Sequence, residues 1–360
     1  MNTINTKIPK RVLIAAAGTG GHIFPGLAIA EALRSKGWNV SWLGTKIGME
    51  NRLVKERNFQ FESIEFGGTR GKGILTWLLM PFRLIKAIFE CGAVIVRVKP
   101  NLVIGFGGYV TLPTGLAAKC MGKQLAIHEQ NSIIGLSNKV LACLTKNVFT
   151  AFPNVLKKAV VSGNPLRNEF VLIPEPSVRF INRHGPLNLL IIGGSLGAKF
   201  LNETVPQAIK LIALENRPSV THQSGVNQYA SLKNLYESLS IDASVLSFIE
   251  DTAQAFADAD LIICRAGAST VTEIAAVGAA AMFVPLPSAV DDHQTKNAMY
   301  LVNSQAAWLQ PQRELTPQKL ADEILKMNRT ILLKTAEKSK KLYIPNSVDK
   351  IVDACEELVK

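Results

Sequence analysis

Short apolar runs alternate with segments of helical spacing along almost the whole chain. The strands expected from these runs are residues 11–17, 39–43, 102–105, 124–127 and 148–151 in the first half, and 187–192, 220–223, 244–248, 261–264 and 281–284 in the second. Helical spacing follows in segments such as 25–36 and 273–277. Strands alternating with helices pair in parallel, because each helix returns the chain to the edge where the next strand starts. The pattern predicts α/β domains with doubly wound parallel sheets.

Each half opens with the same local pattern, a strand, a glycine turn and a helix. Residues 12–14 lead into the glycine turn 18–21, and residues 189–192 lead into the glycine turn 193–197. This repetition predicts two Rossmann-like domains that face a cleft, one over residues 1–165 and one over 166–344. A helix within 345–360, expected at 347–358, would pack back on the first domain.

The composition fits a compact protein in a reducing compartment. Apolar residues make up 48% of the chain and charged residues 19%, which excludes a disordered chain. The five cysteines are scattered without a close pair, which argues against a disulfide framework and against zinc. The apolar runs 12–17 and 74–82 are too short for a signal peptide and for a membrane span, which needs about 20 residues.

The positive charge is concentrated in the first half. Residues 1–165 carry 21 Lys and Arg against 7 Asp and Glu, whereas the remaining residues carry 19 against 21. The first domain is therefore expected to meet an anionic partner. Nucleic acid and an anionic membrane both satisfy this charge.

Glycine turns after predicted strands are candidate phosphate sites. They lie at 18–21, 105–108 and 193–197, and the segment 265–270 is a fourth candidate. Backbone N–H groups can approach a phosphate there, and the following helix presents its positive end. The same glycines also serve simply as tight turns. None of the turns has the dinucleotide-binding spacing with its acidic residue, and segment 67–72 lacks the Walker spacing, so NAD and P-loop chemistry are disfavoured.

Polar side chains follow two of these features. His22 begins the helix after the first glycine turn, where the positive helix end favours a neutral imidazole that can act as a base, or it caps the helix. His128, Glu129, Gln130 and Asn131 follow a strand, where their donors and acceptors suit a sugar or form a surface loop.

Two acidic motifs have competing interpretations. Thr270 to Glu273 has the spacing of a capping box, but Glu273 would equally suit the hydroxyls of a ribose. Asp258 and Asp260 have the D-x-D form of metal-dependent sugar transferases, yet they lie away from every glycine turn. We interpret D-x-D as a chance match, so helix ends and arginines are expected to neutralise a leaving diphosphate.

As a set and in this order, the motifs resemble those of the MurG family, the N-acetylglucosaminyltransferases that complete the lipid-linked precursor of peptidoglycan. The resemblance covers about residues 10–300. It rests on Gly18-Thr19-Gly20-Gly21-His22, Phe24-Pro25-Gly26, Gly107-Gly108-Tyr109, His128-Glu129-Gln130-Asn131, Gly163-Asn164-Pro165-Leu166-Arg167, Gly193-Gly194-Ser195, Arg265-Ala266-Gly267-Ala268-Ser269-Thr270 and Asp291-Asp292-His293-Gln294. It implies a GT-B fold and an inverting transfer of N-acetylglucosamine from UDP-N-acetylglucosamine, with no metal or other cofactor. The implied acceptor is the C4 hydroxyl of undecaprenyl-pyrophosphoryl-MurNAc-pentapeptide, which makes lipid II from lipid I.

The resemblance also implies roles for individual residues. The donor would be bound by Thr19, Gly20, Gly21, Asn131, Arg167, Ser195, Ile249, Ala268, Ser269, Thr270, Val271, Thr272, Glu273 and Gln294. Among these, Glu273 would hold the ribose, the Ile249 backbone the uracil, and Gln294 the sugar hydroxyls. Tyr109 and Asn138 would lie on the acceptor side, and either His22 or Glu129 would be the catalytic base. Ala17 and Leu196 depart from the family pattern, and Leu196 removes a polar side chain near the donor.

An apolar and cationic segment completes the expectation. It comprises Ile74, Leu75, Trp77, Leu78, Leu79, Phe82, Arg83 and Lys86. Such a mixture suits either an amphipathic core helix or a surface that inserts among anionic headgroups. A lipid-linked acceptor favours the second, with the protein peripheral at the cytoplasmic face of the inner membrane.

Two alternative functions stay open at this stage. A UDP-N-acetylglucosamine 2-epimerase would share the architecture and the sugar nucleotide. A non-catalytic basic module would bind nucleic acid in a salt-dependent manner, but the chain has no known nucleic-acid motif, so no nucleic acid is expected.

Overall fold

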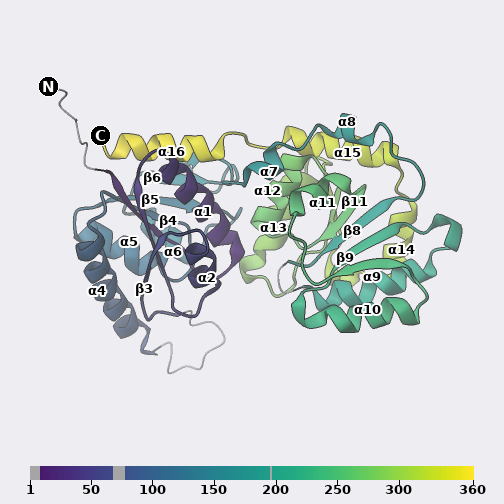
Figure 1. The fold of residues 1–360 in the computed structure, drawn as a ribbon, viewed down its shortest axis with the longest axis horizontal. Helices are drawn as coiled ribbons and strands as arrows, with labels where there is room; N and C mark the ends of the chain where they lie inside the picture. The colour runs from purple at the N-terminus through teal and green to yellow at the C-terminus, as the bar shows by residue number, and fades with distance from the viewer. Residues whose placement is uncertain (1–8, 68–77, 195–196) are drawn as a thin grey trace. The chain divides into compact units, whose positions relative to one another are not determined.

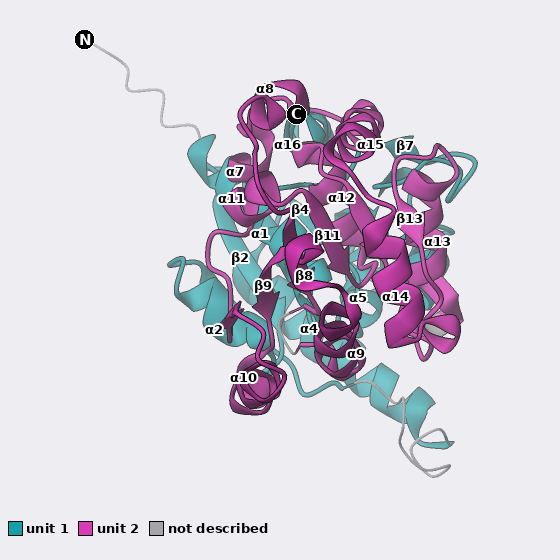
Figure 2. Ribbon diagram, turned by 90° about the vertical axis from the view of Figure 1, so that its right-hand side faces the viewer, with its two compact units in different colours: residues 1–166, 346–360 teal, residues 167–345 magenta. Residues whose placement is uncertain are grey.

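The computed structural model describes residues 9–67, 78–194 and 197–360, which form two compact units. Unit 1 comprises Met1–Leu166 and Asn346–Lys360, and unit 2 comprises Arg167–Pro345 (Figure 1; Figure 2, teal and magenta). Each division falls one residue after the boundary expected from the sequence. Helix α16 (Ser347–Leu358) closes the chain and belongs to unit 1.

Unit 1 is built on a seven-stranded parallel sheet in the order β3-β2-β1-β4-β5-β6-β7. The strands are β1 (Arg11–Ala15), β2 (Asn39–Gly44), β3 (Gln60–Ser63), β4 (Leu102–Gly105), β5 (Gln124–Glu129), β6 (Asn147–Thr150) and β7 (Val160–Val161). Its other helices are α1 (Gly20–Ser35), α2 (Met49–Lys55), α4 (Met80–Val98), α5 (Thr111–Cys120) and α6 (Leu136–Leu141). The edge strands β3 and β7 were not expected, because β3 contains a single apolar residue and β7 is only two residues long.

The alternation of side chains along the strands divides the core of unit 1 into two layers. Val12 and Ile14 of β1 face α1 and α16 on one side of the sheet. Leu13 and Val103 face α4 and α5 on the other side (Figure 1). Strands buried on both faces read as continuous apolar runs, which is why the sequence indicated them.

Unit 2 repeats this plan with a six-stranded parallel sheet in the order β10-β9-β8-β11-β12-β13. The strands are β8 (Asn188–Ile192), β9 (Ser219–Gln223), β10 (Ala243–Leu246), β11 (Leu261–Cys264), β12 (Ala281–Phe283) and β13 (Trp308–Leu309). The helices are α7 (Asn168–Val171), α8 (Pro176–Phe180), α9 (Lys199–Leu211), α10 (Tyr229–Ser238), α11 (Thr252–Asp258), α12 (Ala268–Val277), α13 (His293–Val302), α14 (Pro317–Leu325) and α15 (Arg329–Lys341). Short 3-10 turns lie at η1 (Leu214–Asn216), η2 (Val226–Gln228), η3 (Val290–Asp292) and η4 (Gln312–Glu314). The expected pair of parallel α/β sheets is confirmed.

Two helices begin earlier than the sequence indicated. Helix α1 begins at Gly20 and α12 at Ala268, each directly after its glycine turn. Of the two interpretations of Thr270 to Glu273, the capping box is excluded, because Gly267 is the N-cap and Thr270 lies inside the helix. The Thr272 hydroxyl donates to the carbonyls of Ala268 and Ser269 at 3.0 and 2.9 Å. The first amides of α12 are therefore not covered by this motif.

The D-x-D segment is structural. Asp260 is fully buried, and its carboxylate accepts from Arg183 at 2.6 Å and from Arg329 at 3.0 Å. Its second oxygen also accepts from the backbone N–H of Asn188 at 2.9 Å. Asp258 is exposed, and its carboxylate accepts from Gln254 at 2.7 Å. Among the described residues, no group of three or more His, Cys, Asp or Glu side chains is placed to hold a metal ion.

In the described part of the chain, no helix is both long and apolar enough to cross a bilayer.

Replacing Asp260 tests the buried ion cluster. Asp260→Ala leaves two arginines without their anion and lowers the free energy of unfolding by about 3 to 5 kcal/mol. Asp258→Ala, two positions away on the surface, changes it by no more than about 0.5 kcal/mol. Urea denaturation measures both, and equal losses would contradict the structural role of Asp260.

Candidate active site

The first candidate base lies in the first turn of α1. Thr19 is the N-cap of this helix, but its side chain makes no capping bond to the backbone. The Thr19 hydroxyl lies 3.5 Å from Nδ1 of His22. Gly20 and Gly21 are the first two helical residues, so their N–H groups have no partner within the helix. The turn therefore combines open amides with an imidazole, as the sequence predicted.

The second glycine turn packs directly against the first. A Cβ on Gly107 would lie 2.8 Å from Cδ2 of His22, and one on Gly108 would lie 2.2 Å from the carbonyl oxygen of Ala17. Both glycines have positive φ angles, +96° and +79°, which side chains rarely adopt. Tyr109 reaches the same place, since a Cβ on Gly18 would lie 3.7 Å from its ring. Glycine is therefore required at both positions, and the two turns form one surface.

The carboxylate of Glu129 is enclosed by donors. Glu129 is 2% exposed, and its Oε1 accepts from the backbone N–H and the side-chain amide of Asn131 at 3.0 and 3.2 Å. Its Oε2 accepts from the Gly135 N–H at 3.0 Å and from the Asn138 amide at 2.9 Å. Asn138 is itself buried and also donates to the His128 carbonyl at 3.1 Å. Glu129 and Asn138 thus hold the loop after β5 in place, a role that their positions in the sequence did not reveal.

His128 is buried next to this loop. Its Nε2 lies 3.0 Å from the carbonyl oxygen of Gly163, and its Nδ1 lies 3.1 Å from the Gln130 amide nitrogen. Burial lowers the pKa of His128 to about 4, although the Gly163 carbonyl and the Glu129 charge act in the opposite direction. The imidazole is therefore neutral at physiological pH and serves as part of the scaffold.

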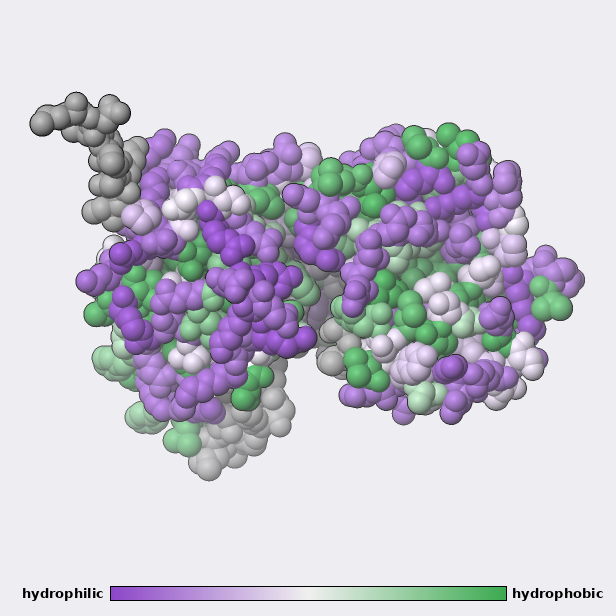
Figure 3. Space-filling model, in the orientation of Figure 1, coloured by the Kyte–Doolittle hydropathy of each residue, from purple (hydrophilic) through white to green (hydrophobic). Residues whose placement is uncertain are grey.

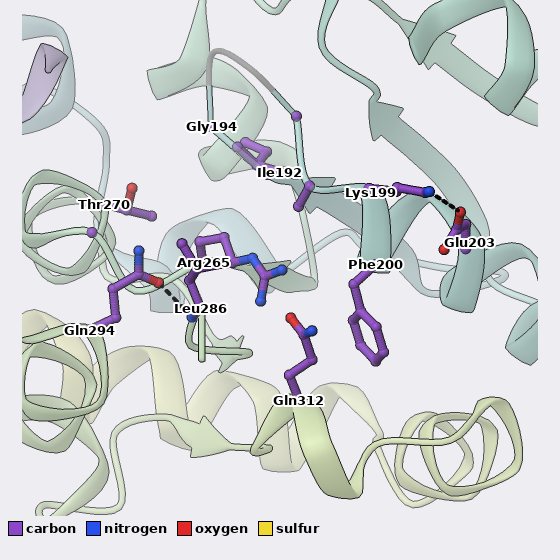
Figure 4. Close-up of a pocket in the computed structure, with 14 residues that line it drawn as sticks. Ile192, Gly194, Lys199, Phe200, Glu203, Arg265, Thr270, Leu286, Gln294 and Gln312 are labelled. Carbon is purple, nitrogen blue, oxygen red and sulfur yellow. Dashed lines mark hydrogen bonds and ion pairs between the residues drawn. The ribbon is translucent and has the colours of Figure 1, made fainter. Parts of the chain in front are cut away.

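In unit 2 a cavity of about 660 Å³ lies at the carboxyl ends of the strands (Figure 4). Its wall includes the glycine turn at Gly193 and Gly194, the N-cap Gly267 of α12, and Thr270 and Gln294. Carboxyl ends of parallel strands are where α/β domains bind ligands. Of the donor residues expected here, Thr270 and Gln294 line the cavity. Ser195 lies outside the described residues.

Arg265 supplies the positive charge in this cavity. One guanidinium nitrogen, Nη1, donates to the carbonyls of Val284 and Pro285 at 2.8 and 3.2 Å, which fixes the side chain. Burial lowers the pKa of Arg265, and among the described residues no carboxylate forms an ion pair with it. Figure 4 shows its guanidinium directed between Gln312 and Phe200. A half-buried cation without an anion suits a negatively charged ligand. Arg265 belongs to a motif seen in the sequence, from which arginines were expected to neutralise a diphosphate without Arg265 being singled out.

Glu273 lies one helical turn beyond Ser269 on α12 and is half-buried. Burial raises its pKa to about 7, and the charge of Arg167 lowers it. Arg167 is held by Thr252, which accepts at 3.1 Å, and by an ion pair with Glu169 at 3.2 Å.

Ile249 is buried after β10. Among the other expected residues, Ala268, Val271 and Thr272 are buried in α12, and Ser269 is half-buried. Of the residues expected at the donor, Ala268 to Glu273 thus form the first turns of α12, and Gln294 lines the same cavity as Thr270.

The apolar segment continues further along α4 than the sequence suggested. Of the expected residues, Ile74, Leu75 and Trp77 lie outside the described ranges, whereas Leu78, Leu79 and Phe82 are exposed. Phe89 is 74% exposed, and Ile85 and Val96 follow the same helical face. We call Leu78, Phe82, Ile85, Phe89 and Val96 the outer face of α4. Apolar residues are visible in Figure 3 where α4 lies in Figure 1. Arg83 flanks this face, while Lys86 forms ion pairs with Glu65 and Glu90.

Comparison with known proteins identifies the class first. The glycosyltransferase family 28 N-terminal domain matches residues 12–150, and the family 28 C-terminal domain matches residues 188–354. The chain is thus a glycosyltransferase built from both domains of this family.

The relatives define the family more narrowly. A protein from a Polaromonas species is 55% identical over 99% of this chain and 93% of its own length, and is named UDP-N-acetylglucosamine–N-acetylmuramyl-(pentapeptide) pyrophosphoryl-undecaprenol N-acetylglucosamine transferase. The crystal structure of Acinetobacter baumannii MurG is 42% identical, covers 97% of this chain and 100% of that chain, and superimposes with a TM-score of 0.84. The chain belongs to this family, the MurG transferases.

A third comparison concerns the alternative function. A Listeria monocytogenes protein assigned as a UDP-N-acetylglucosamine 2-epimerase is 12% identical over 97% of this chain and 96% of its own, with a TM-score of 0.65. Likeness at this identity reflects the shared fold alone.

Glu273 makes the stability of the ligand-free protein depend on pH. Its pKa is raised from 4.5 to about 7, so the folded state retains a proton that the unfolded state releases. Protonated Glu273 therefore makes its full contribution to the free energy of unfolding below pH 4.5. This contribution is lost as the pH rises to about 7. Glu273→Gln removes this loss and should stabilise the protein by about 2 to 3 kcal/mol at pH 8, with little effect at pH 4.5. Urea denaturation at both pH values measures the difference, and a stabilisation that does not change with pH would contradict it.

Proposed function

We propose that the chain transfers N-acetylglucosamine from UDP-N-acetylglucosamine to the C4 hydroxyl of undecaprenyl-pyrophosphoryl-MurNAc-pentapeptide, the step from lipid I to lipid II. The observation that carries the proposal is the cavity of unit 2, in which a glycine turn, an uncapped helix start and the charge of Arg265 surround space for a diphosphate. The names of the relatives supply the sugar nucleotide and the acceptor.

The donor is assigned to unit 2. Its diphosphate lies at the first amides of α12 and at Gly193 and Gly194, because unpaired N–H groups and the helix dipole favour anions. Glu273 accepts from the ribose hydroxyls, and the Ile249 backbone pairs with the uracil. The side-chain amide of Gln294 donates hydrogen bonds to the sugar hydroxyls. Its oxygen already accepts from the Leu286 N–H at 2.9 Å, which leaves the amide N–H groups for the ligand (Figure 4).

No divalent ion is assigned to the reaction. The diphosphate is neutralised by backbone amides and by Arg265, whose guanidinium is already fixed by two carbonyls. The D-x-D carboxylate that would bind a metal, Asp260, is committed to Arg183 and Arg329.

The acceptor is assigned to unit 1. The diphosphate of the acceptor binds to the two glycine turns that pack together, residues 18–21 and 105–108, with Tyr109 beside them. Asn131 is assigned to the donor, and its side-chain amide donates to Glu129 at 3.2 Å.

His22 is assigned as the base. Both oxygens of Glu129 are bound by two donors each, which stabilises the carboxylate in its loop and leaves it poorly placed to take a proton. His22 lies in the first turn of α1, with its Nδ1 3.5 Å from the Thr19 hydroxyl. As the acceptor oxygen bonds to the anomeric carbon, the bond from that carbon to the β-phosphate oxygen breaks with its electron pair. The hydroxyl proton passes to His22, UDP leaves, and the anomeric configuration inverts.

Membrane binding is assigned to the outer face of α4. The residues from Phe82 to Val96 extend over about 21 Å of helix, enough to lie along a headgroup layer. Arg83 adds attraction to anionic lipids at the cytoplasmic face of the inner membrane. A lipid-linked acceptor requires the enzyme to work at this surface.

The epimerase alternative differs in one measurable respect. An epimerase converts UDP-N-acetylglucosamine without any acceptor, whereas the proposed transferase leaves the sugar unchanged until a lipid acceptor is added. The proposal fails if the donor alone is converted.

The choice of base is tested by two substitutions. His22→Ala should lower kcat at least about 100-fold with the KM for the donor within about twofold. Glu129→Gln keeps an acceptor oxygen in the loop and should lower kcat by less than about tenfold. Steady-state kinetics with a lipid acceptor measures both. The reverse order of effects would reassign the base to Glu129.

Membrane docking is tested on vesicles that contain anionic phospholipid. Replacing Phe82 and Phe89 together with serine should weaken vesicle binding at least about tenfold, because two exposed rings no longer enter the lipid. The matched control replaces Val178 and Ile181 of unit 2, which are 59% and 69% exposed, and should leave vesicle binding unchanged. Co-sedimentation measures both, and equal effects would contradict a role for α4.

A further inference from the structure

Gln130 carries a buried acceptor that lacks a donor. The residue is 1% exposed, and its Oε1 has no hydrogen-bond partner among the described residues. Buried side-chain oxygens are nearly always paired, and leaving one unpaired costs about 1 to 3 kcal/mol. An oxygen held in this state next to a candidate base therefore requires an explanation.

The direction of the Gln130 amide is fixed by His128. Nε2 of His128 faces the carbonyl oxygen of Gly163, which can only accept, so Nε2 carries the proton and Nδ1 is an acceptor. The Gln130 nitrogen donates to that Nδ1 at 3.1 Å and to the His128 carbonyl at 3.3 Å. Turning the amide over would place its oxygen against two acceptors. The oxygen is thus compelled to point away from His128.

Gly107 marks the place where this oxygen and His22 approach each other. A Cβ on Gly107 would lie 3.1 Å from Nε2 of His22 and 3.6 Å from Oε1 of Gln130. Because Gly107 has no side chain, the space between the ring nitrogen and the oxygen stays open. The other ring nitrogen, Nδ1, lies on the side of Thr19.

We propose that Gln130 is a positioning residue for the base, an inference that rests on His22 having that role. The Gln130 oxygen accepts the Nε2–H of His22 when the imidazole turns toward it over Gly107. This contact fixes the tautomer in which Nδ1 is unprotonated. The acceptor hydroxyl then gives its proton to Nδ1, and the Gln130 oxygen stabilises the imidazolium that results. His128 contributes indirectly by orienting the amide.

The other titratable groups around His22 are already engaged. Glu129 is bound by Asn131, Gly135 and Asn138. Glu50 of α2 accepts from the backbone and the hydroxyl of Thr45 at 3.0 and 2.8 Å and from the Gly18 N–H at 3.4 Å. His128 is neutral, and Tyr109 lies against Gly18. Among these groups His128 is hydrogen-bonded to Gln130, but it is buried and neutral, so a shift in the His22 titration reports on the Gln130 oxygen.

The experiment is an NMR titration of protein labelled at histidine Cε1, with the His22 signal among five histidines assigned by its absence in His22→Ala. Gln130→Met keeps the side-chain length but removes the acceptor, so the pKa of His22 should fall by about 0.5 to 1 unit. As a neutral acid, Gln130→Glu can present the same oxygen to His22 while its O–H donates to His128 in place of the amide. In that variant the pKa of His22 should equal or exceed the wild-type value.

Kinetics provides a second measurement on the same variants. Gln130→Met should lower kcat about tenfold without changing either KM, and the acid limb of its kcat profile should move to lower pH. Gln130→Glu should retain activity. An unchanged His22 titration in the Met variant would overturn the proposal. If the Met variant does not fold, a pKa of His22 below the wild-type value in the Glu variant would overturn it.

The result separates this inference from the proposed function. If His22→Ala retains turnover, the assignment of the base is wrong whatever the titration shows. If His22→Ala abolishes turnover while the pKa of His22 is indifferent to residue 130, the assigned base stands and only the role of Gln130 is refuted.

Discussion

The rest of the structure's function depends on backbone N–H groups at the starts of α1 and α12 that have no partner within their helix. At both places a glycine turn ends a buried strand, and the N-cap residue supplies no side-chain bond to the helix. Among the described helices of unit 2 only α11, α14 and α15 have a side-chain cap, from Asp251, Thr316 and Asn328, so the glycine at its N-cap and not the missing side-chain cap distinguishes α12. A helix that caps itself has fewer amides for a ligand, whereas an uncapped one presents its amides and its dipole to an anion.

Close packing around the glycine turns keeps those amides in place. Gly107 and Gly108 fit against His22 and Ala17 with no room for a side chain. In unit 2, Gly197 fits against the Ser224 carbonyl in the same way, and Gln223 donates to the Gly194 carbonyl at 3.0 Å. Beneath this turn Asn202, His222 and Tyr236 form a fully paired buried chain of hydrogen bonds. Rigid surroundings of this kind allow backbone dipoles to stabilise charge without rearrangement.

Much of the fold could be predicted from the sequence, because buried parallel strands such as β4 and β11 are short apolar runs bounded by turns. The edge strands β3, β7 and β13 were not predicted, since they are short and are not buried on both faces. The capping box at Thr270 failed because the helix start is set by Gly267 and by packing of the turn.

Glu129, Gln130 and Arg265 were recognisable as polar residues near a site. Their roles depend on partners far away in the sequence, such as Gly163 and Val284, which local patterns cannot reveal. The outer face of α4 was only partly found, because spacing alone does not distinguish its apolar face toward the core from the one toward solvent.

The central claim is that a diphosphate is held in unit 2 by backbone amides and Arg265, with no divalent ion. Calorimetric titration of the whole protein with UDP, in EDTA and again with excess Mg²⁺, tests this claim most directly. The account predicts the same Kd under both conditions, within about twofold, because each diphosphate contact comes from the protein. Loss of UDP binding in EDTA, with recovery on addition of Mg²⁺, would contradict it.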